Sequence, residues 1–391
     1  MNMRSIKLFI KSLCFFVFRI FPIQKNKIFF DNYNGRSFGC NPKYIAEKLH
    51  ELYPEYKIVF QVQNGFENGF PDYIKLVKFE SIQSIYEQVT SKIWVTNVRR
   101  SIIAKKRKGQ FYIQTWHGAI GVKKCEKDAL DKITPQSIKQ ALHDSPLIDL
   151  MISNSGFCTS VYKRAFWYSG KIAEFGYPRN DLIVNSKEDV VRKYFNLKSE
   201  TKILFYAPTF RKDTAAWDSG LDIQRVLKAY ENKFSGHWIC LLRLHPWAKK
   251  HCKGKNLYNE YTLNATDYPD IQELLAYSDS IITDYSSCMF DFLISRKPAF
   301  MFAPDIKNYL NERGLLFEIN ELPFACALNN DELEKAILDF EAPSYLKKVN
   351  DFFAKYTLKD DGKASERCAD LIHKLCSSEQ FEDALKEVEL C

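Results

Sequence analysis

The chain has 391 residues, of which 46% are hydrophobic and 27% are charged, and this composition excludes a disordered or fibrous protein. The length suits about two domains of roughly 150–200 residues each. Lys and Arg exceed Asp and Glu by 56 to 48, and the resulting formal charge of +8 fits an anionic substrate, a phosphorylated polymer or an anionic membrane surface. The eleven cysteines contain no C-x-x-C pair, so we expect a reducing, cytoplasmic setting rather than a zinc site or a disulfide framework.

The first segment, residues 6–23, is an apolar run that Lys7, Lys11 and Arg19 interrupt. These charges argue against a membrane-spanning helix, and the lack of a small-residue cleavage site argues against a signal peptide. A helix packed on the domain surface is one interpretation. We favour the other, an amphipathic helix over residues 1–24 that lies in the membrane interface with its basic side toward anionic headgroups.

Short apolar runs alternate with longer helical patterns along the rest of the chain, which predicts α/β layers with parallel sheets. A helix is expected over 42–52. The strands of a first series are expected at 27–33, 57–63, 92–97, 111–116 and 147–154. Those of a second series are expected at 202–208, 237–246, 280–287 and 297–304.

The most economical architecture is a pair of Rossmann-like domains that face a central cleft. The predicted parts are the first domain over 25–183, a charged linker over 184–200, the second domain over 201–376 and a tail over 377–391. Ligands of such sheets bind at the carboxyl ends of the strands, and the polar residues of this chain cluster there.

His117, followed by Gly118, stands where a predicted strand ends. A histidine at this place can exchange protons near neutral pH, and Lys123 and Lys124 are close enough in sequence to meet a phosphate. A structural histidine beside a turn glycine is an equally good interpretation.

Arg243 and His245 alternate with leucines before Pro246, so both side chains are expected on one side of a strand end, where they suit a diphosphate. The alternative is a cation pair on an edge strand. Arg211, in the sequence YAPTFR, follows another predicted strand, and a surface arginine is an equally good interpretation there.

Thr283, Ser286 and Ser287 follow an apolar strand and begin a helical pattern. Free amides and hydroxyls at a helix start bind anions, although ordinary N-capping explains the serines as well. Arg179 lies in a turn that we interpret as structural, with a phosphate contact as the alternative, and Ser365 with Arg367 fits ordinary helix capping.

Other signatures are missing from the sequence. It has no Walker loop and no GxGxxG, and no motif for nucleic-acid binding. The basic run over residues 99–108 is expected to be a solvated face, or else a surface that attracts a phosphopolymer or anionic lipid.

Taken together, these segments resemble the CDP-glycerol glycerophosphotransferase family, which includes teichoic acid primases and polymerases. The segments that carry the resemblance are, in order, CNPKYI (40–45), QTWHG (114–118), GYPRND (176–181), YAPTFR (206–211), LRLHP (242–246), ITDYSS (282–287) with FDF (290–292), and DGKASER (361–367). The resemblance implies a GT-B fold, with the donor nucleotide on the C-terminal domain and the acceptor toward the N-terminal one. It also implies a peripheral enzyme on the cytoplasmic face of the inner membrane.

The resemblance further implies that a hydroxyl of a lipid-linked saccharide or phosphopolymer attacks CDP-glycerol or another CDP-polyol and releases CMP. His117 is then the general base, and His245 binds or protonates the leaving phosphate. The residues expected to bind the donor are Arg211, Arg243, Thr283, Ser286, Ser287, Ser365 and Arg367. Those expected on the acceptor side are Trp116, Gly118, Lys123, Lys124 and Arg179. We expect no cofactor and no obligatory metal, because no acidic metal cluster is evident in the sequence.

Two alternatives belong to other classes. One is a GT-B glycosyltransferase that uses a nucleotide-sugar, and the other is a membrane-bound polyanion binder without catalysis. The sequence leaves open whether the polyol is glycerol or ribitol, whether one unit or many are added, and whether the product is a wall teichoic acid or a capsule.

Overall fold

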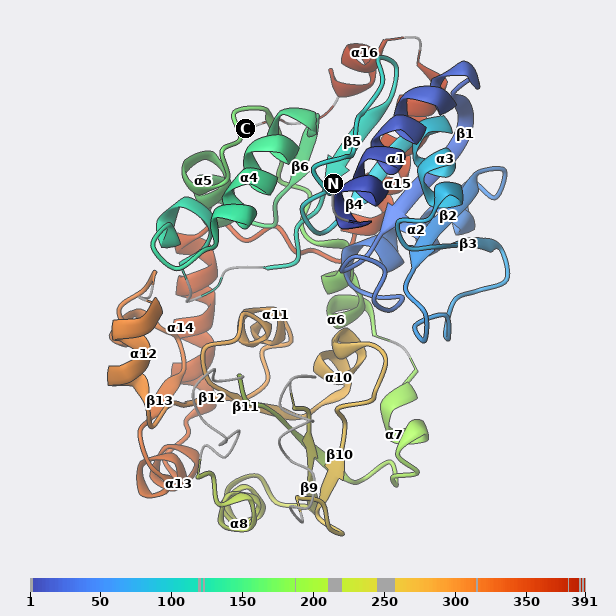
Figure 1. Cartoon of the computed structure of the whole chain (residues 1–391). Helices are drawn as coiled ribbons and strands as arrows, with labels where there is room; N and C mark the ends of the chain where they lie inside the picture. The colour runs from blue at the N-terminus through green and yellow to red at the C-terminus, as the bar shows by residue number, and fades with distance from the viewer. Residues whose placement is uncertain are drawn as a thin grey trace. The chain divides into compact units, whose positions relative to one another are not determined.

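The computed structural model describes residues 3–118, 121, 124–186, 188–209, 220–244, 257–313, 316–378, 380–386, 388 and 390. The chain divides into two compact units, each built on one parallel sheet flanked by helices (Figure 1). The first unit comprises Met1–His117, Cys125–Asp181 and Leu358–Cys391. The second comprises Gly118–Lys124 and Leu182–Thr357.

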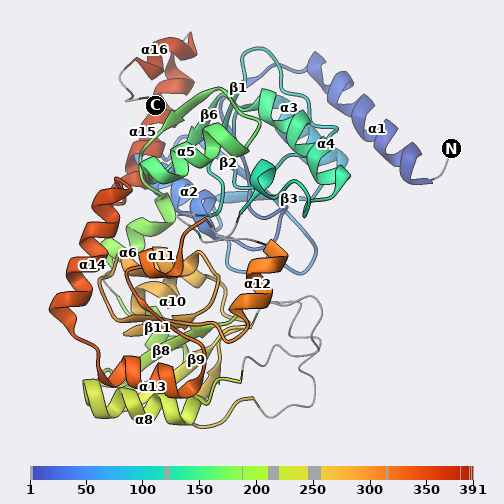
Figure 2. The same ribbon diagram turned by 90° about the vertical axis from the view of Figure 1, so that its left-hand side faces the viewer.

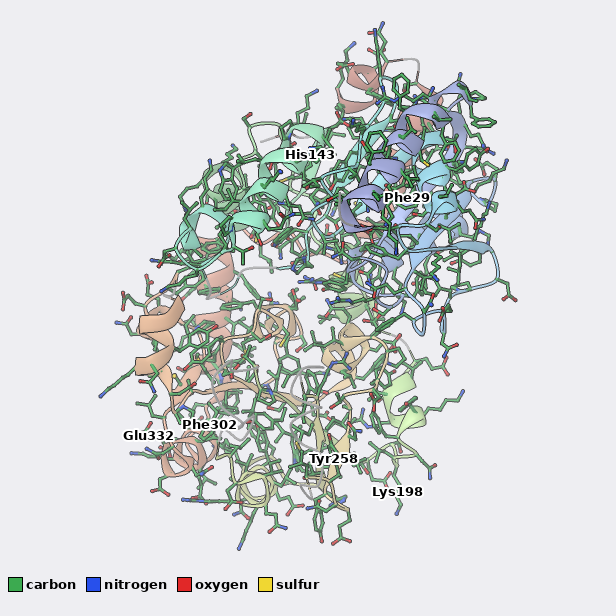
Figure 3. The ribbon with its side chains drawn as sticks, viewed as in Figure 1. Phe29, His143, Lys198, Tyr258, Phe302 and Glu332 are labelled. Carbon is green, nitrogen blue, oxygen red and sulfur yellow. The ribbon has the colours of Figure 1, made fainter. Side chains whose placement is uncertain are left out.

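The sheet of the first unit has the strand order β3-β2-β1-β4-β5-β6-β7, and its strands pair in parallel. The strands are β1 (Gln24–Asp31), β2 (Lys57–Val62), β3 (Ile74–Lys78), β4 (Ser91–Thr96), β5 (Phe111–Gln114), β6 (Leu150–Ile152) and β7 (Lys171–Ala173). In the inner strand β1, Ile28, Phe29 and Phe30 are fully buried, as expected for a parallel strand covered on both faces. Phe29 lies within the side chains of this core (Figure 3).

Helices between successive strands of the first unit connect them in the manner of a Rossmann fold, whereas α1 and η1 precede β1, and α15 and α16 come after the second unit. The helices of the first unit are α1 (Met3–Val17), η1 (Phe18–Ile20), α2 (Cys40–Leu52), α3 (Ile82–Thr90), η2 (Glu126–Ala129), α4 (Pro135–Asp144), η3 (Ser145–Leu147), α5 (Gly156–Ala165), η4 (Pro178–Asn180), α15 (Ala364–Ser377) and α16 (Phe381–Leu385). The reversal of strand order lies between β1 and β4, so the loops after these strands flank the place where such sheets bind ligands.

Helix α1 stands at the periphery of the first unit (Figure 2) and has two different sides. On one side Phe15 is buried and Lys11 bonds Glu80 at 2.7 Å, and this side faces the domain. On the other side a helical row of large apolar side chains is exposed, namely Ile6, Phe9, Ile10, Leu13, Phe16 and Val17. The prediction that the basic side faces outward is therefore wrong for Lys11, whose side chain turns toward the domain. No helix in the described part of the chain has both the length and the apolar character needed to cross a membrane.

Helix α15 returns the end of the chain to the first unit, where it packs against α2 (Figure 1). Tyr53, just after α2, donates to Asp370 at 2.9 Å and stacks on His373 with ring centroids 4.1 Å apart. The sequence division placed residues up to 376 in the second domain, but the chain from Leu358 onward belongs to the first unit. The apolar face of α15 was visible in the sequence, whereas the sheet that it covers was not.

The sheet of the second unit has the order β10-β9-β8-β11-β12-β13, and its strands also pair in parallel. The strands are β8 (Lys202–Ala207), β9 (Trp238–Leu242), β10 (Thr262–Asn264), β11 (Ser280–Thr283), β12 (Ala299–Phe302) and β13 (Ala325–Ala327). The core of this unit includes Phe302 on β12 (Figure 3). Its strand order reverses between β8 and β11.

The described helices of the second unit are α7 (Val190–Tyr194), α8 (Ile223–Phe234), α10 (Ile271–Tyr277), α11 (Cys288–Leu293), α12 (Ile306–Arg313), η5 (Ile319–Glu321), α13 (Asn330–Leu338) and α14 (Ala342–Lys355). A short helix, α6 (Asp181–Asn185), begins where the two units meet in sequence. The stretch expected as a linker, 184–200, belongs to the second unit instead. Arg192 fastens it there, because its guanidinium donates to Thr201 O and pairs with Asp279 at 2.6 Å.

Every strand expected from the sequence is present, with ends that differ by a few residues. Among the described residues, the strands that were not predicted are β3, β7, β10 and β13, which form the edges of the two sheets. Edge strands are partly exposed, so they lack the continuous apolar run that identifies a buried parallel strand.

Candidate active site

His117 lies in the loop after β5, at the carboxyl edge of the first sheet. Trp116 has a φ of 51°, in the left-handed region, and this unusual backbone turns the chain sharply at the end of the strand. The amide of Trp116 donates to Gln114 Oε1 at 2.9 Å, which fixes the turn. The prediction that this histidine follows a strand is confirmed, although β5 ends at Gln114, two residues earlier than expected.

The imidazole of His117 is oriented by a neighbouring strand. Its Nδ1 lies 2.6 Å from the carbonyl oxygen of Asn97, the residue after β4. A carbonyl can only accept, so Nδ1 carries the hydrogen and Nε2 carries the lone pair of the neutral ring. Trp116 stacks on the ring at 4.4 Å, and Tyr33 meets it edge-on at 5.3 Å. The side chain therefore presents a proton acceptor in a fixed orientation.

Burial lowers the pKa of His117 to about 4, and the positive charge of Arg179 acts in the same direction, while the hydrogen bond to Asn97 opposes them. Because the pKa lies below the ordinary value of 6.5, the ring is neutral at neutral pH. A neutral imidazole with an unprotonated Nε2 can accept a proton from a hydroxyl.

Arg179, expected to contact phosphate on the acceptor side, instead has a structural position beside His117. It is 4% exposed, and its Nη1 donates to the carbonyl oxygen of His117 at 2.6 Å and to Cys40 Sγ at 3.3 Å. Its backbone amide donates to Asn41 Oδ1. The structural interpretation of this turn is thus supported, with the guanidinium holding the histidine loop.

Asn41 ties the same loop to the start of α2. Its Nδ2 donates to the carbonyl oxygens of Trp116 at 3.1 Å and Thr115 at 3.3 Å. Neither Asn41 nor Asn97 was predicted from the sequence to have a role. The signal available for Asn97 was its place at the end of an apolar strand, and for Asn41 its place in the CNPKYI segment.

The basic run over 99–108 is not a uniformly solvated face. Arg99 and Arg100 are buried, and each pairs with a carboxylate: Arg100 with Asp31 at 2.6 Å and Arg99 with Glu126 at 3.0 Å. These two arginines can be buried in the interior of the first unit because a carboxylate compensates the charge of each.

In the second unit, the loops after β8 and β11 are joined by Asp284. This buried carboxylate accepts from the amide of Thr209 at 3.0 Å, from the Thr209 hydroxyl, and from the amide of Tyr285 at 2.7 Å. Thr283, expected to bind the donor, is fully buried and donates its hydroxyl to Ala207 O at 2.6 Å. Thr283 therefore joins β11 to β8. Asp284 was not among the predicted site residues.

The predicted anion site at Ser286 and Ser287 lies at the start of α11, a helix of six residues. Both serines are partly exposed. Ser286 Oγ accepts from the amide of Cys288 at 3.4 Å, and Ser287 makes no side-chain cap bond within the described chain. Arg243, after β9, donates to the carbonyl oxygens of Ala265 at 2.9 Å and Tyr268 at 2.7 Å.

Ser365 and Arg367, expected to bind the donor, lie in the first unit. Ser365 is buried and donates to Pro178 O at 3.1 Å, and its amide donates to Asp181 at 2.6 Å. Arg367 donates to Phe175 O at 2.8 Å and pairs with Asp361. These bonds fit the capping and packing interpretation that the residues alone supported.

Three predicted residues, His245, Arg211 and Lys123, lie outside the described residues. Lys124 is exposed and Gly118 is partly exposed. Within the described ranges, no group of three His, Cys, Asp or Glu side chains is placed to hold a metal ion.

Residues 13–374 match the family described as CDP-Glycerol:Poly(glycerophosphate) glycerophosphotransferase. A teichoic acid poly(glycerol phosphate) polymerase of Staphylococcus epidermidis is 31% identical over 375 residues, which are 90% of this chain and 51% of that protein. The chain thus spans about half the length of this relative and of a similar Bacillus subtilis polymerase. The teichoic acid glycerol-phosphate transferase of Staphylococcus aureus is 28% identical, over 90% of this chain and 94% of its own length.

Among solved structures, the wall teichoic acid polymerase TagF is similar with a TM-score of 0.82 at 29% identity, over 99% of this chain and 97% of that chain. A histidine variant of TagF soaked with CDPG has the same score and identity, over 96% of each chain. These likenesses, with the two parallel sheets, confirm the predicted α/β fold of GT-B type.

Proposed function

Since the chain belongs to the CDP-glycerol:poly(glycerophosphate) glycerophosphotransferase family, we propose that it transfers a polyol phosphate from a CDP-polyol to an acceptor hydroxyl and releases CMP. Glycerol phosphate is the proposed group, because the family description and the names of several relatives refer to it. The proposed acceptor is a lipid-linked saccharide or a growing phosphopolymer, and the product is a teichoic-acid-like or capsular phosphopolymer. The observation that carries the proposal is the bond from His117 Nδ1 to Asn97 O, which leaves Nε2 able to accept a proton.

In the proposed reaction, the acceptor oxygen attacks the β-phosphorus of the CDP-polyol. A new P–O bond forms to the acceptor, the P–O bond to the CMP phosphate breaks, and the hydroxyl proton passes to Nε2 of His117. The net result is one phosphodiester and CMP. General-base help of this kind is worth roughly 10²–10⁴-fold in rate. Arg179 and Asn41 act as positioning residues, because their bonds go to the loop that carries the imidazole.

The donor is proposed to bind to the second unit, at the carboxyl edge where the strand order reverses between β8 and β11. Ser286 and Ser287, which follow β11 and are partly exposed, are the proposed phosphate contacts in the described chain. Arg211 and His245 are retained from the sequence as proposed contacts, with His245 as the group that binds or protonates the leaving phosphate. Thr283 and Arg243 act through the positions of the loops that they fasten.

We further propose that the protein is peripheral to the cytoplasmic face of the membrane, held there by α1. The support is the row of exposed apolar side chains on this helix, with Phe9 at 63% and Phe16 at 68% exposed. A face of this kind partitions into the interface between headgroups and acyl chains. A membrane-bound enzyme would meet a lipid-linked acceptor in the same layer.

The proposal is tested by incubating the purified protein with CDP-glycerol, CDP-ribitol and a nucleotide-sugar, each with a lipid-linked acceptor, and by analysing the products. We expect CMP release from CDP-glycerol in step with a new phosphodiester. A glycosidic product formed from the nucleotide-sugar, with no turnover of either CDP-polyol, would contradict it.

A further inference from the structure

A cavity of about 490 Å³ lies beneath α1, and all its lining residues belong to the first unit. Its walls come from α1, from the ends of β2 and β3, from α3, from the loops after β1 and β4, and from α4. The volume is within the range of small-molecule sites, about 300–1,000 Å³. The reaction proposed above uses none of the lining residues.

One wall of the cavity is cationic. Lys7, Lys11 and Arg100 line it, against a single acidic lining residue, Glu80. Glu80 is engaged by Lys11 at 2.7 Å, and Asp31 behind the wall is engaged by Arg100 at 2.6 Å. Lys7 has no acidic partner within the described chain, so the wall keeps an excess of positive charge.

Arg100 supplies an independent indication that the cavity can bind an anion. The side chain is 5% exposed, and among the described residues its Nε has no hydrogen-bond acceptor. Buried N–H groups are almost always paired, and a charged donor without an acceptor is especially costly. An oxygen of an anionic group in the cavity would satisfy it. Gln88 and Gln140 line the same space and hold Arg100 in place: Gln88 Oε1 accepts from the guanidinium, and Gln140 Nε2 donates to the Arg100 carbonyl oxygen at 3.0 Å.

Much of the remaining lining is apolar and includes Leu8, Phe79 and Ile103. If a small free anion were bound, this apolar surface would stay exposed to water, whereas an anion with an apolar chain would cover it. The inner face of α1, with Lys7 and Leu8, forms one wall, and the outer face of the same helix exposes Phe9 and Phe16. A molecule from the lipid layer that α1 is proposed to touch has the chemistry that the cavity requires.

Two residues that line the cavity are also near in sequence to residues that contact His117, the candidate base. Asn34 lines it, and the preceding residue, Tyr33, contacts the ring of His117. Arg100 lines it, and Asn97, in the same loop after β4, orients that ring. The cavity and the imidazole therefore share the carboxyl edge of one sheet.

From these observations we infer that the cavity beneath α1 binds the phosphate-bearing end of a lipid, with Lys7 and Arg100 toward the phosphate and the apolar wall along the first part of the chain. The ligand has two sources with the same chemistry, a membrane phospholipid or the lipid carrier of the acceptor. Only the second source rests on the proposed transferase function.

The test is the binding of water-soluble lipids to the full chain, measured by isothermal titration calorimetry without donor or turnover. The probes are dihexanoylphosphatidylglycerol for a phospholipid, farnesyl diphosphate for a lipid carrier, and inorganic phosphate and dihexanoylglycerol as the two halves of the chemistry. We expect at least one anionic lipid to bind about tenfold or more tightly than either half. Tighter binding of the first or of the second probe identifies the source, and equal binding supports the shared chemistry.

Two variants locate the site. Lys7→Glu places a negative charge in the cationic wall, and Leu8→Trp narrows the cavity without changing any charge. Each is expected to weaken lipid binding about tenfold or more, whereas Lys163→Glu, the same change at an exposed lysine on α5, leaves it unchanged. Circular dichroism checks that each variant is folded.

The inference is overturned if neither anionic lipid binds, if phosphate or the neutral lipid binds as tightly, or if both folded cavity variants bind like the parent. Because no turnover is measured, any of these results leaves the proposed transfer reaction standing.

Discussion

At the scale of single residues, the imidazole of His117 is held as a neutral ring whose Nε2 can take a proton. The pKa is lowered to about 4 by burial and by Arg179, so the base form exists above that pH and is lost as the pH falls through it. We predict that kcat/KM for transfer stays level from about pH 8 down to about pH 6 and declines only toward pH 4. A pH–rate profile checks this, and an acid limb centred near 6.5 would show an imidazole with an ordinary pKa.

Arg179 provides a second prediction, because it acts on His117 both by a hydrogen bond and by charge. Arg179→Met should lower kcat by roughly 10–100-fold through misplacement of the loop, with the KM for the donor little changed. Loss of the positive charge should also move the acid limb to higher pH, while Arg179→Lys should keep the limb near its original place. Arg164→Met, at a surface arginine that pairs with Asp128, is the matched control and should behave as the parent does. A folded Arg179→Met variant with parental kcat and an unmoved limb would contradict the positioning role.

At the scale of elements, helix α1 has one side packed on the first unit and one side exposed. Phe9→Asp with Phe16→Asp removes two exposed apolar groups, each worth about 1.5–3 kcal/mol on full burial. The partition coefficient of the double variant onto anionic vesicles, measured by flotation, should fall more than tenfold, while its thermal stability is unchanged. Leu338→Asp, at an exposed leucine on α13, is the control and should float like the parent. Undiminished flotation of the double variant would remove α1 from membrane binding.

Helix α3 is fastened to β1 by a buried ion pair, which yields a stability prediction. Lys27 and Glu87 are each 2% exposed and lie 2.7 Å apart, and Lys75 joins Glu87 at 2.5 Å. Glu87→Gln leaves Lys27 charged and buried, which should cost about 3–5 kcal/mol in denaturant unfolding. Glu334→Gln, which breaks the exposed pair with Arg225, should cost about 0–1 kcal/mol. Equal losses in the two variants would show that the buried pair contributes no more than a surface one.

The strands and helices also show which parts of the fold can be predicted from the sequence. The central strands were predictable because burial on both faces requires a continuous apolar run, as in Ile28–Phe30. Edge strands such as β10 and β13 were missed because half-exposed residues give no such run. At the candidate site, His117 was predictable from its place after a strand. The bonds from Arg179 and Asn41 join segments distant in sequence, and nothing in either segment alone indicates the partner.

At the scale of the whole molecule, the sequence indicated two Rossmann-like units but assigned the end of the chain to the wrong one. The buried face of α15 follows helical spacing, at Cys368, Ile372 and Leu375, and such a face can cover any sheet. Only the fold shows that this helix lies against α2 in the first unit. This placement also bears on Ser365 and Arg367. The family resemblance implied that both contact the donor, but in the structure both bond to residues of the first unit.

For the molecule as a whole, the proposed function depends on His117 as the base of a transfer from a CDP-polyol. The measurement that tests it most directly compares His117→Ala with the parent for CMP release from CDP-glycerol and for the Kd of CDP-glycerol. We predict a fall in turnover of roughly 10²–10⁴-fold with little change in Kd, because the imidazole acts on the acceptor hydroxyl. Parental turnover by the folded His117→Ala protein would contradict the role of His117 as the base.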